Sequence, residues 1–360
     1  MHSFSFRDLE WNLLVPISLL LVLSLSMIYD LHGFERASYQ LIWILLSIGL
    51  MLIILAVDYR SLTRIAVLLY PVMIVALILV LFTDPINGAR SWFRFGKFSL
   101  QPSEFTKPVL ILTLAAYIPF REFYKRFFGL IPPLALTLLP TFLVILQPDL
   151  GTALLFIPIF FVIVIFAGAK PANIVMLIVL AFAVSPILYS VMEEHQQQRI
   201  QAYLNPSHFS KTVGTHLEQA KIAIGAGGIT GYSPGEDEPA PHNSFLVFAS
   251  TDYAFAVVGE QYGFLGSVAI LLLYLWIVMA GYNLTIRTRD PVGKLFVAGS
   301  TGMIAAQAVL HIGGNLHLLP FTGVPCPFLS YGGSAAMASI ICVALMQNVA
   351  MRKRLVFGGD

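Results

Sequence analysis

Charged side chains are scarce in this chain, and a few of them stand at the edges of long apolar runs. Only 11% of the 360 residues are charged. Glu104 and Lys107, in the stretch QPSEFTK, are three residues apart, a spacing that places both side chains on one face of a helix. A charge at membrane depth costs roughly 2.5 to 3.5 kcal/mol, so it should face a cavity, a partner or the interface. The two residues either bind substrate or take part in catalysis, or they form an ion pair that only neutralises two buried charges.

Three further carboxylates stand alone beside or within apolar runs. Asp149, in QPDLGT, can cap the helix that follows it, and Glu260 is expected to be a packed, hydrogen-bonded core group. Asp252 directly precedes the apolar run YAFAVVGEQYGFLG, which places its carboxylate at a membrane surface. Such a carboxylate can act as a general base. It can also be an N-cap worth about 1 kcal/mol, and both interpretations stay open.

Two glycine-rich stretches contain further candidate site residues. KIAIGAGGITG, residues 221–231, lacks the lysine that follows the last glycine of a P-loop. GVPCPFLSYGGSA, residues 323–335, predicts a rigid turn that is either a substrate clamp or a re-entrant corner whose backbone is satisfied by protein. The sequence contains no HExxH or Cys/His zinc spacing, and GYSPG at 231–235 lacks the context of a serine nucleophile. These patterns exclude metalloprotease and serine hydrolase chemistry.

The elements that position these residues are membrane helices. Apolar residues make up 58% of the chain and the mean hydropathy is +0.81, which excludes a water-soluble protein. Runs such as LIWILLSIGLMLIILAV do not alternate in polarity, so a transmembrane β-barrel is excluded as well. The sequence therefore predicts an all-α polytopic membrane protein, a single domain over residues 1–360. Its ten predicted spans are 11–29, 39–57, 65–83, 104–119, 130–146, 152–168, 172–192, 253–282, 295–316 and 333–351.

The distribution of basic residues in short loops predicts the orientation of these spans. With ten spans, the basic clusters all lie on one side, which is cytoplasmic by the positive-inside rule. Both termini are then cytoplasmic, and the stretch 193–252 is a large extracellular loop. A formal charge of +2 gives no field for nucleic acid, so no nucleic-acid partner is expected. Cys326 and Cys342 are interpreted as packing residues.

Seven motifs, in order along the chain, resemble the SEDS family of bacterial cell-wall proteins, which includes RodA and FtsW. KIAIGAGG and the QQQR string resemble RodA more than FtsW. One family motif, usually Pro-Glu-x-His-Thr-Asp, reads VFASTD over 247–252 here. The seven motifs are GARSW at 88, QPSEFTK at 101, QPDLGT at 147, HQQQRIQAYLNP at 195, HLEQAKIAIGAGGITG at 216, STDYAFAVVGEQYG at 250 and LLPFTGVPCPFLSYGGS at 318.

The resemblance implies a fold of about ten helices with a large extracellular loop between the seventh and eighth. It also implies a peptidoglycan glycosyltransferase of the bacterial cytoplasmic (inner) membrane, which polymerises lipid II at the outer face during cell elongation. The implied partners are lipid II, a class B penicillin-binding protein, other elongation-complex membrane proteins and membrane lipids. Asp252 matches the family's essential aspartate, and the positions expected to bind substrate or support it are Glu104, Lys107, Arg90, Arg199, Gln219, Lys221 and Asp149.

The implied reaction needs two kinds of group. A base must take the proton of an acceptor hydroxyl, and Asp252 suits this task. A positive group, or a divalent cation such as Mg or Mn, must stabilise the departing pyrophosphate, although the sequence contains no self-contained metal site. Lys107, Arg90, Arg199 and Lys221 are the basic candidates. Two other functions remain open, a lipid II flippase and a scaffold that only docks the penicillin-binding protein.

Overall fold

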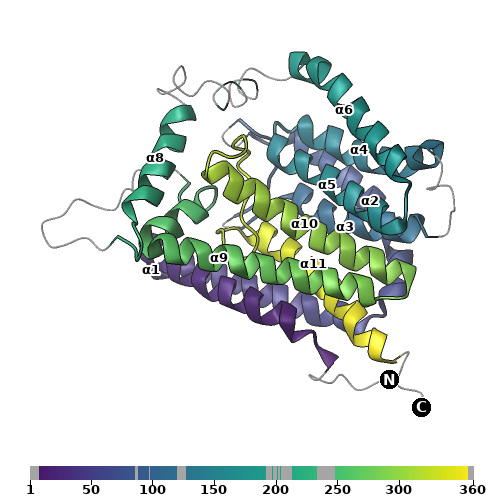
Figure 1. The fold of residues 1–360 in the computed structure, drawn as a ribbon, viewed down its shortest axis with the longest axis horizontal. Coiled ribbons are helices and arrows are strands. Elements are labelled where there is room, and N and C mark those ends of the chain that lie inside the picture. The colour runs from purple at the N-terminus through teal and green to yellow at the C-terminus, as the bar shows by residue number, and fades with distance from the viewer. Residues whose placement is uncertain are drawn as a thin grey trace, which may run out of the picture.

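The structure is a computed structural model, and it is a bundle of helices (Figure 1). It describes residues 8–85, 88–96, 98–119, 127–191, 197, 201, 203, 213–232 and 248–355. The helices are α1 (Trp11–Ala56), α2 (Tyr59–Leu79), α3 (Pro102–Tyr117), α4 (Ile131–Ile145), α5 (Leu150–Ala167), α6 (Pro171–Val191), α8 (Val213–Ala226), α9 (Ala254–Arg287), α10 (Pro291–Asn315) and α11 (Gly333–Leu355). Two short 3-10 helices, η2 (Val80–Phe82) and η4 (Phe127–Leu130), extend α2 and precede α4, and the strands are β1 (Phe93–Phe95) and β2 (Phe98–Leu100).

The helical membrane fold predicted from hydropathy is confirmed. Among the described residues, seven helical segments are long and apolar enough to cross a membrane. Each of the ten predicted ranges overlaps a described helix. Two ranges share α1, and two others correspond to α3 and to α6, whose stretch Pro171–Pro186 is a shorter apolar helix. The chain is therefore an integral membrane protein whose core lies between its helices.

The structure differs from the predicted boundaries in three places. The break expected between residues 29 and 39 is a kink inside α1, where Gly33 has non-helical backbone angles. The predicted loop over 193–252 contains α8, which packs on α9. The segment between the predicted spans 65–83 and 104–119 contains an antiparallel hairpin in which Phe93 pairs with Leu100. Aromatic residues favour such a hairpin, but three-residue strands are too short for period-two alternation to predict.

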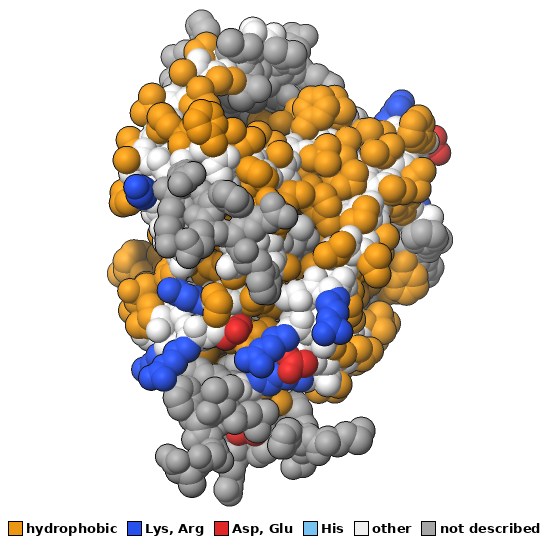
Figure 2. Space-filling model, turned by 90° about the vertical axis from the view of Figure 1, so that its right-hand side faces the viewer, with side chains coloured by type: hydrophobic (Ala, Val, Ile, Leu, Met, Phe, Trp, Pro, Cys, Tyr) orange, Lys and Arg blue, Asp and Glu red, His pale blue; other side chains and the backbone are white. Residues whose placement is uncertain are grey.

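Contacts between loops and caps define the two ends of the bundle. At one end, Asp58 lies 3.7 Å from Arg352, and Arg60 lies 4.0 Å from Asp290. Figure 2, which views the bundle from the right-hand side of Figure 1, shows Lys and Arg side chains gathered on this face. The opposite end brings together the starts of α3, α5, α9 and α11, as described below. The basic residues Arg60 and Arg352 thus lie at the end of the bundle opposite these helix starts.

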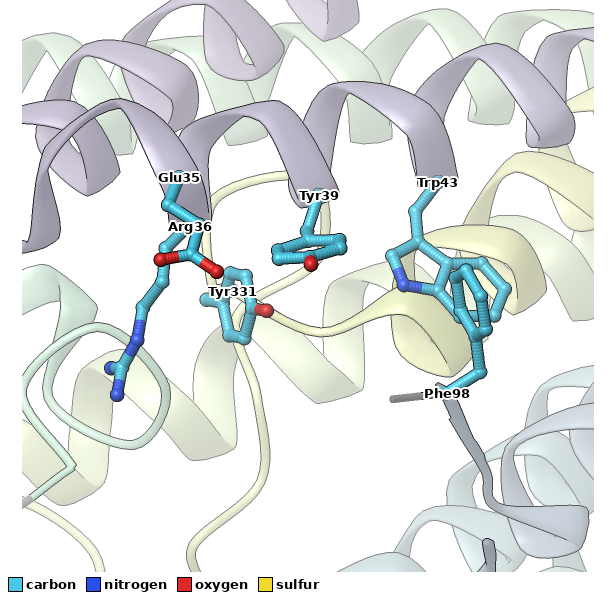
Figure 3. Close-up of a pocket in the computed structure, with 6 residues that line it drawn as sticks. All are labelled: Glu35, Arg36, Tyr39, Trp43, Phe98 and Tyr331. Carbon is cyan, nitrogen blue, oxygen red and sulfur yellow. The ribbon is translucent and has the colours of Figure 1, made fainter. Parts of the chain in front are cut away.

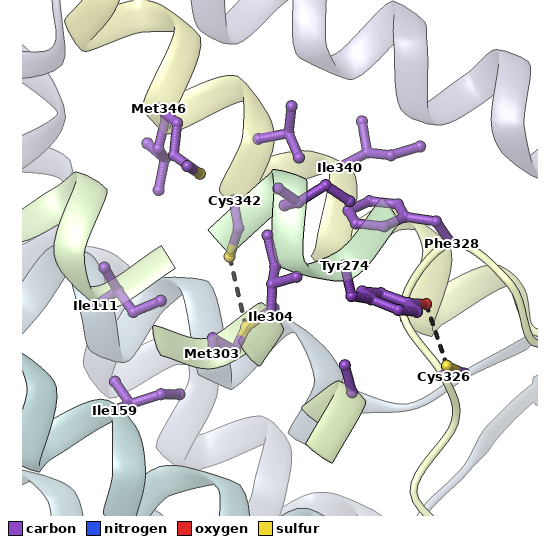
Figure 4. Close-up of a cluster of buried hydrophobic side chains, with 14 of the residues drawn as sticks. Ile111, Ile159, Tyr274, Met303, Ile304, Cys326, Phe328, Ile340, Cys342 and Met346 are labelled. Atoms are coloured by element: carbon purple, nitrogen blue, oxygen red, sulfur yellow. Dashed lines mark hydrogen bonds between the residues drawn. The ribbon is translucent and has the colours of Figure 1, made fainter. Parts of the chain in front are cut away.

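The centre of the bundle is packed with aliphatic and aromatic side chains from several helices (Figure 4). α10 lies between α5 and α9, and α1 packs against α9 and α11. Both cysteines are free and buried in this core, which confirms that they are packing residues. Cys326 contacts the Tyr274 hydroxyl at 3.1 Å, and Cys342 contacts Met303 at 3.5 Å.

Candidate functional site

The non-helical segment between α10 and α11, residues 316–332, organises one end of the bundle. Most of its residues from Val324 to Ser330 are buried, so its backbone groups need partners inside the protein. The Pro325 carbonyl accepts from Gln307 Nε2 at 2.9 Å, and the Pro327 carbonyl accepts from the Tyr274 hydroxyl. Residues 316–332, named the corner, therefore fit the second sequence interpretation, a re-entrant turn whose backbone groups are satisfied by protein.

Three polar side chains of α10 hold this corner, and sequence reasoning did not select them. Gln307, His311 and Asn315 stand at four-residue intervals, which places them on one helix face, and all three are buried. Phe255 N–H donates to His311 Nε2 at 3.4 Å, so the proton resides on Nδ1, which donates to the Val324 carbonyl at 2.7 Å. The four-residue repeat of polar residues in an apolar helix is the signal that could have revealed them.

Asp252 lies where this corner meets the start of α9. Its backbone carbonyl accepts from Asn315 Nδ2 at 3.1 Å. Ser330 Oγ donates to the Thr251 carbonyl at 2.5 Å, and Tyr253 stacks on Phe321 with ring centroids 4.8 Å apart. The N-cap of α9 is Tyr253, which makes no side-chain cap hydrogen bond. Capping of α9 therefore does not account for the Asp252 carboxylate.

The Asp252 carboxylate faces Gly323. A Cβ atom at position 323 would lie 3.5 Å from Asp252 Oδ2, and Gly323 has φ +66°, a backbone conformation that favours glycine. Two buried polar atoms nearby, Asn315 Oδ1 and Thr322 Oγ1, have no hydrogen-bond partner within the described residues. Buried polar atoms without a partner are rare in folded proteins. They mark positions next to Asp252 where a substrate group or water can bind.

Glu104 and Lys107 form the ion pair that their spacing predicts. Lys107 Nζ lies 2.8 Å from Glu104 Oε2 and 2.9 Å from Oε1, and the side chains are 1% and 0% exposed. Lys107 Nζ also donates to Gln307 Oε1 at 3.4 Å. Because Gln307 in turn holds the Pro325 carbonyl, the pair is connected to the corner that positions Asp252.

Asp149 caps α5, as its sequence context predicts, and it also connects two motifs. Asp149 Oδ1 accepts from Thr152 N–H at 3.1 Å, and Oδ2 accepts from Gln101 Nε2 at 2.8 Å. Gln101 N–H donates to Ser334 Oγ at the start of α11. The starts of α3, α5 and α11 therefore meet around the same corner.

Gly151 is where α5 touches the corner most closely, and it gives a first testable prediction. A Cβ atom at position 151 would lie 2.3 Å from the Thr322 carbonyl oxygen, so Gly151→Ala must shift the backbone beside Gly323. We expect a loss of about 1 to 3 kcal/mol of stability, as for overpacked cores. The thermal unfolding midpoint of the purified protein measures it.

The control is Gly49→Ala on α1, where no atom lies within 4 Å of the new Cβ. Alanine is the better helix former there, so the midpoint should stay equal or rise. Equal midpoints for Gly151→Ala and Gly49→Ala would show that α5 is not in close contact with the corner at Gly151.

The glycine-rich stretch 221–231 packs against α9. A Cβ atom at Gly227 would lie 2.0 Å from the Gly259 carbonyl oxygen, so the glycine allows two backbones to approach closely. Tyr232 N–H donates to the Glu260 carbonyl at 2.7 Å, and Phe264 N–H donates to the Gly228 carbonyl at 2.8 Å. Glu260 itself is 1% exposed, as expected for a core group. These contacts explain the glycines by packing rather than by phosphate binding.

The remaining predicted site residues are exposed or half-buried, or they lie outside the described residues. Arg90 is exposed, and its guanidinium donates to the Leu81 carbonyl at 3.3 Å. Lys221 is exposed on α8, and Gln219 is half-buried on the same helix. Arg199 lies outside the described residues. No group of three or more His, Cys, Asp or Glu residues that could hold a metal occurs in the described part of the chain.

The fold and the site define a class: helical membrane proteins with a carboxylate beside a buried, non-helical segment. Comparisons with known proteins show the family. The family model of FtsW, RodA and SpoVE, described as cell cycle proteins, matches residues 8–355. The chain therefore belongs to this family, as its motifs predict.

Curated relatives and solved structures agree with this family. The chain is 31% identical to the probable peptidoglycan glycosyltransferase FtsW of Geobacter metallireducens, over 89% of this chain and 86% of the relative. It is 32% identical to the peptidoglycan glycosyltransferase RodA of Mycobacterium leprae, over 95% and 78%. It also superposes on a chain of a peptidoglycan synthase complex that coordinates polymerization and crosslinking. The TM-score is 0.83 at 28% identity, and the match covers 97% of this chain and 99% of that one. The similar identities to FtsW and RodA do not separate the two types.

Proposed function

We propose that this chain is a peptidoglycan glycosyltransferase that polymerises lipid II at the outer face of the bacterial cytoplasmic membrane. The observation that carries the proposal is the placement of Asp252. Its carboxylate faces Gly323 at the end of the bundle away from the basic loops, next to unpartnered polar atoms. The family relationship supports the same activity. Polymerisation of lipid II by the purified chain and its Asp252 variants tests it.

In this proposal Asp252 is the general base. Its carboxylate takes the proton of the acceptor sugar hydroxyl while that oxygen attacks the anomeric carbon of the donor sugar. A glycosidic C–O bond forms, the bond from the anomeric carbon to the pyrophosphate oxygen breaks, and the lipid pyrophosphate leaves with the electron pair. The buried corner keeps the carboxylate in place, because α10 holds its backbone through Asn315.

The leaving pyrophosphate needs positive charge, and burial decides which basic residues are suited to supply it. The charge of Lys107 is offset by Glu104, and both side chains are buried, so this pair is better suited to hold the corner than to meet a pyrophosphate. Arg90 and Lys221 are exposed and are the better candidates among the described residues. A divalent cation, if the reaction uses one, would bring the same kind of charge.

Two further assignments extend the proposal. The chain works with a class B penicillin-binding protein that cross-links the product, and it acts in cell elongation, because its motifs resemble RodA more than FtsW. The flippase alternative is less well supported, since a flippase needs polar groups along a path through the bilayer. Here Asp252, Asp149 and Gln101 all lie around the corner at one end. A pure scaffold would not need a carboxylate at this position.

The proposal requires the loop that contains α8 to face outward, and cysteine labelling checks this orientation. In a background lacking Cys326 and Cys342, Glu218→Cys on the exposed side of α8 should react with a membrane-impermeant maleimide in intact spheroplasts. Arg289→Cys, in the exposed basic loop after α9, should react only after lysis. The neighbouring Thr288 is unsuitable as a reporter, because it is only 6% exposed. Labelling of Arg289→Cys but not of Glu218→Cys in sealed cells would show the opposite orientation and refute the proposed function.

A further inference from the structure

A pocket of about 320 Å³ lies beside the candidate site and is not used by the proposed reaction step. It is lined by Glu35, Arg36, Tyr39 and Trp43 of α1, Phe98 of β2, and Tyr331. Figure 3 shows the two charged side chains at one end, Trp43 and Phe98 at the other, and the two tyrosine rings between them. Tyr39 and Trp43 follow the adjacent Glu35 and Arg36 at intervals of three to four residues, so one side of the helix forms a wall.

The walls of this pocket are held in place by packing and hydrogen bonds. The Trp43 and Phe98 rings meet edge to face, with centroids 5.5 Å apart. A Cβ atom at Gly333 would lie 2.2 Å from the Trp43 indole, so the indole rests directly on the start of α11. Gly332 N–H donates to Gln40 Oε1 at 3.2 Å, which ties the Tyr331 segment to α1. The pocket is therefore built from fixed elements and is preformed.

The same elements connect the pocket to the segment that contains Asp252. Tyr331 N–H donates to the Ser250 carbonyl at 2.8 Å, and the Ser250 hydroxyl is hydrogen-bonded to His32 of α1 at 2.9 Å. Arg36 contacts the His32 ring at 3.3 Å. A ligand held in the pocket would contact Tyr331, which is hydrogen-bonded to Ser250, and Ser250 is two residues from Asp252.

The lining residues restrict the class of ligand. A small anion would be repelled by Glu35 and a small cation by Arg36. An acyl chain would take both charges out of water without giving them hydrogen bonds, which is unfavourable. A sugar ring satisfies the whole lining, because its C–H faces can pack on aromatic rings while its hydroxyls donate to a carboxylate and accept from a guanidinium.

We propose that the pocket lined by Glu35, Arg36, Tyr39, Trp43, Phe98 and Tyr331 is a carbohydrate-binding subsite that holds a sugar of the glycan strand next to the Asp252 turn. The assignment rests on the proposed function for the source of the sugar. The pocket itself does not depend on catalysis, so its binding can be measured without turnover.

The test is a calorimetric titration of the purified full-length protein with chitotetraose, a soluble tetrasaccharide of N-acetylglucosamine. Wild type and Asp252→Asn should bind it equally. Tyr39→Ala removes a ring from the wall, and Glu35→Gln removes a charged acceptor at an exposed position. Each should weaken binding about tenfold, as expected for the loss of one good contact. Tyr29→Ala, an exposed tyrosine of the same helix outside the pocket, is the matched control and should bind like wild type.

The outcomes separate this inference from the proposed function. If Tyr39→Ala and Glu35→Gln lose binding but the wild-type chain does not polymerise lipid II, the subsite is supported and the proposed function is refuted. If the wild-type chain polymerises lipid II but does not bind chitotetraose, the proposed function is supported and the subsite is refuted. Equal binding by wild type, Tyr39→Ala and Glu35→Gln would also overturn the subsite. Elution of each variant at the wild-type volume in gel filtration ensures that lost binding reflects the pocket and not unfolding.

Discussion

Replacing Asp252 with alanine or asparagine is expected to abolish glycan polymerisation by the purified protein and to leave its fold intact. General base catalysis contributes about 10²- to 10⁴-fold to a reaction rate, so the loss should be at least of this order. Stability should change little, because Tyr253 rather than Asp252 is the N-cap of α9. The measurement is the rate of strand formation from lipid II, with the thermal unfolding midpoint recorded on the same sample.

Asp290→Ala is the matched control for this experiment. Asp290 is the N-cap of α10 at the opposite end of the bundle, and its carboxylate accepts from Gly293 N–H at 2.7 Å. Loss of such a cap costs about 0.5 to 2 kcal/mol. The control should therefore lower the unfolding midpoint and retain polymerisation. A well-folded Asp252→Ala protein that still makes long strands would refute the role of Asp252 as the base.

Breaking the Glu104–Lys107 pair should have the largest effect on stability. Both side chains are buried, so removal of one partner leaves an uncompensated charge, which costs roughly 3 to 5 kcal/mol. Lys107→Met keeps most of the side-chain volume and isolates this electrostatic effect. We expect poor expression and a lowered unfolding midpoint for Lys107→Met and for Glu104→Ala. Arg60→Ala is the control, since its contact with Asp290 is 4.0 Å long and the Arg60 side chain is 62% exposed, so it should change stability by less than about 1 kcal/mol.

The double variant Glu104→Lys with Lys107→Glu separates a structural role from a positioning role. The exchange restores the pair and therefore should restore expression. It also places a carboxylate at position 107, where in the wild type Lys107 Nζ donates to the side-chain oxygen Oε1 of Gln307. Gln307 would have to reorient and release the Pro325 carbonyl, which disturbs the corner beside Asp252. Expression with reduced polymerisation is the expected result, and full activity of the exchanged protein would show that the pair only neutralises charge.

The sequence predicted the features that depend on local pattern. Apolar length predicted the helices, the three-residue spacing predicted the Glu104–Lys107 pair, and the position of Asp149 before an apolar run predicted its capping of α5. Each of these depends on residues within one or two helical turns. The same reasoning placed Asp252 at the start of a helix but left its role open between a cap and a base.

The features that depend on distant residues could not be predicted in this way. The contact of Asp252 with Gly323, and of Gly151 with Thr322, joins segments that are far apart along the chain. The four-residue spacing of Gln307 and Asn315 could indicate a polar helix face, but their partners, the Pro325 and Asp252 carbonyls, lie on distant segments. The kink at Gly33 replaced a predicted loop, because a single glycine with non-helical angles can redirect the chain without a run of polar residues.

The most direct test of the central claim is the product formed by the purified full-length chain in proteoliposomes. The sample contains lipid II and the class B penicillin-binding protein of the same bacterium. We expect glycan strands and a matching release of undecaprenyl pyrophosphate with wild type, and neither product with Asp252→Asn. Movement of lipid II between the two leaflets without any glycan strand would contradict the account and favour the flippase.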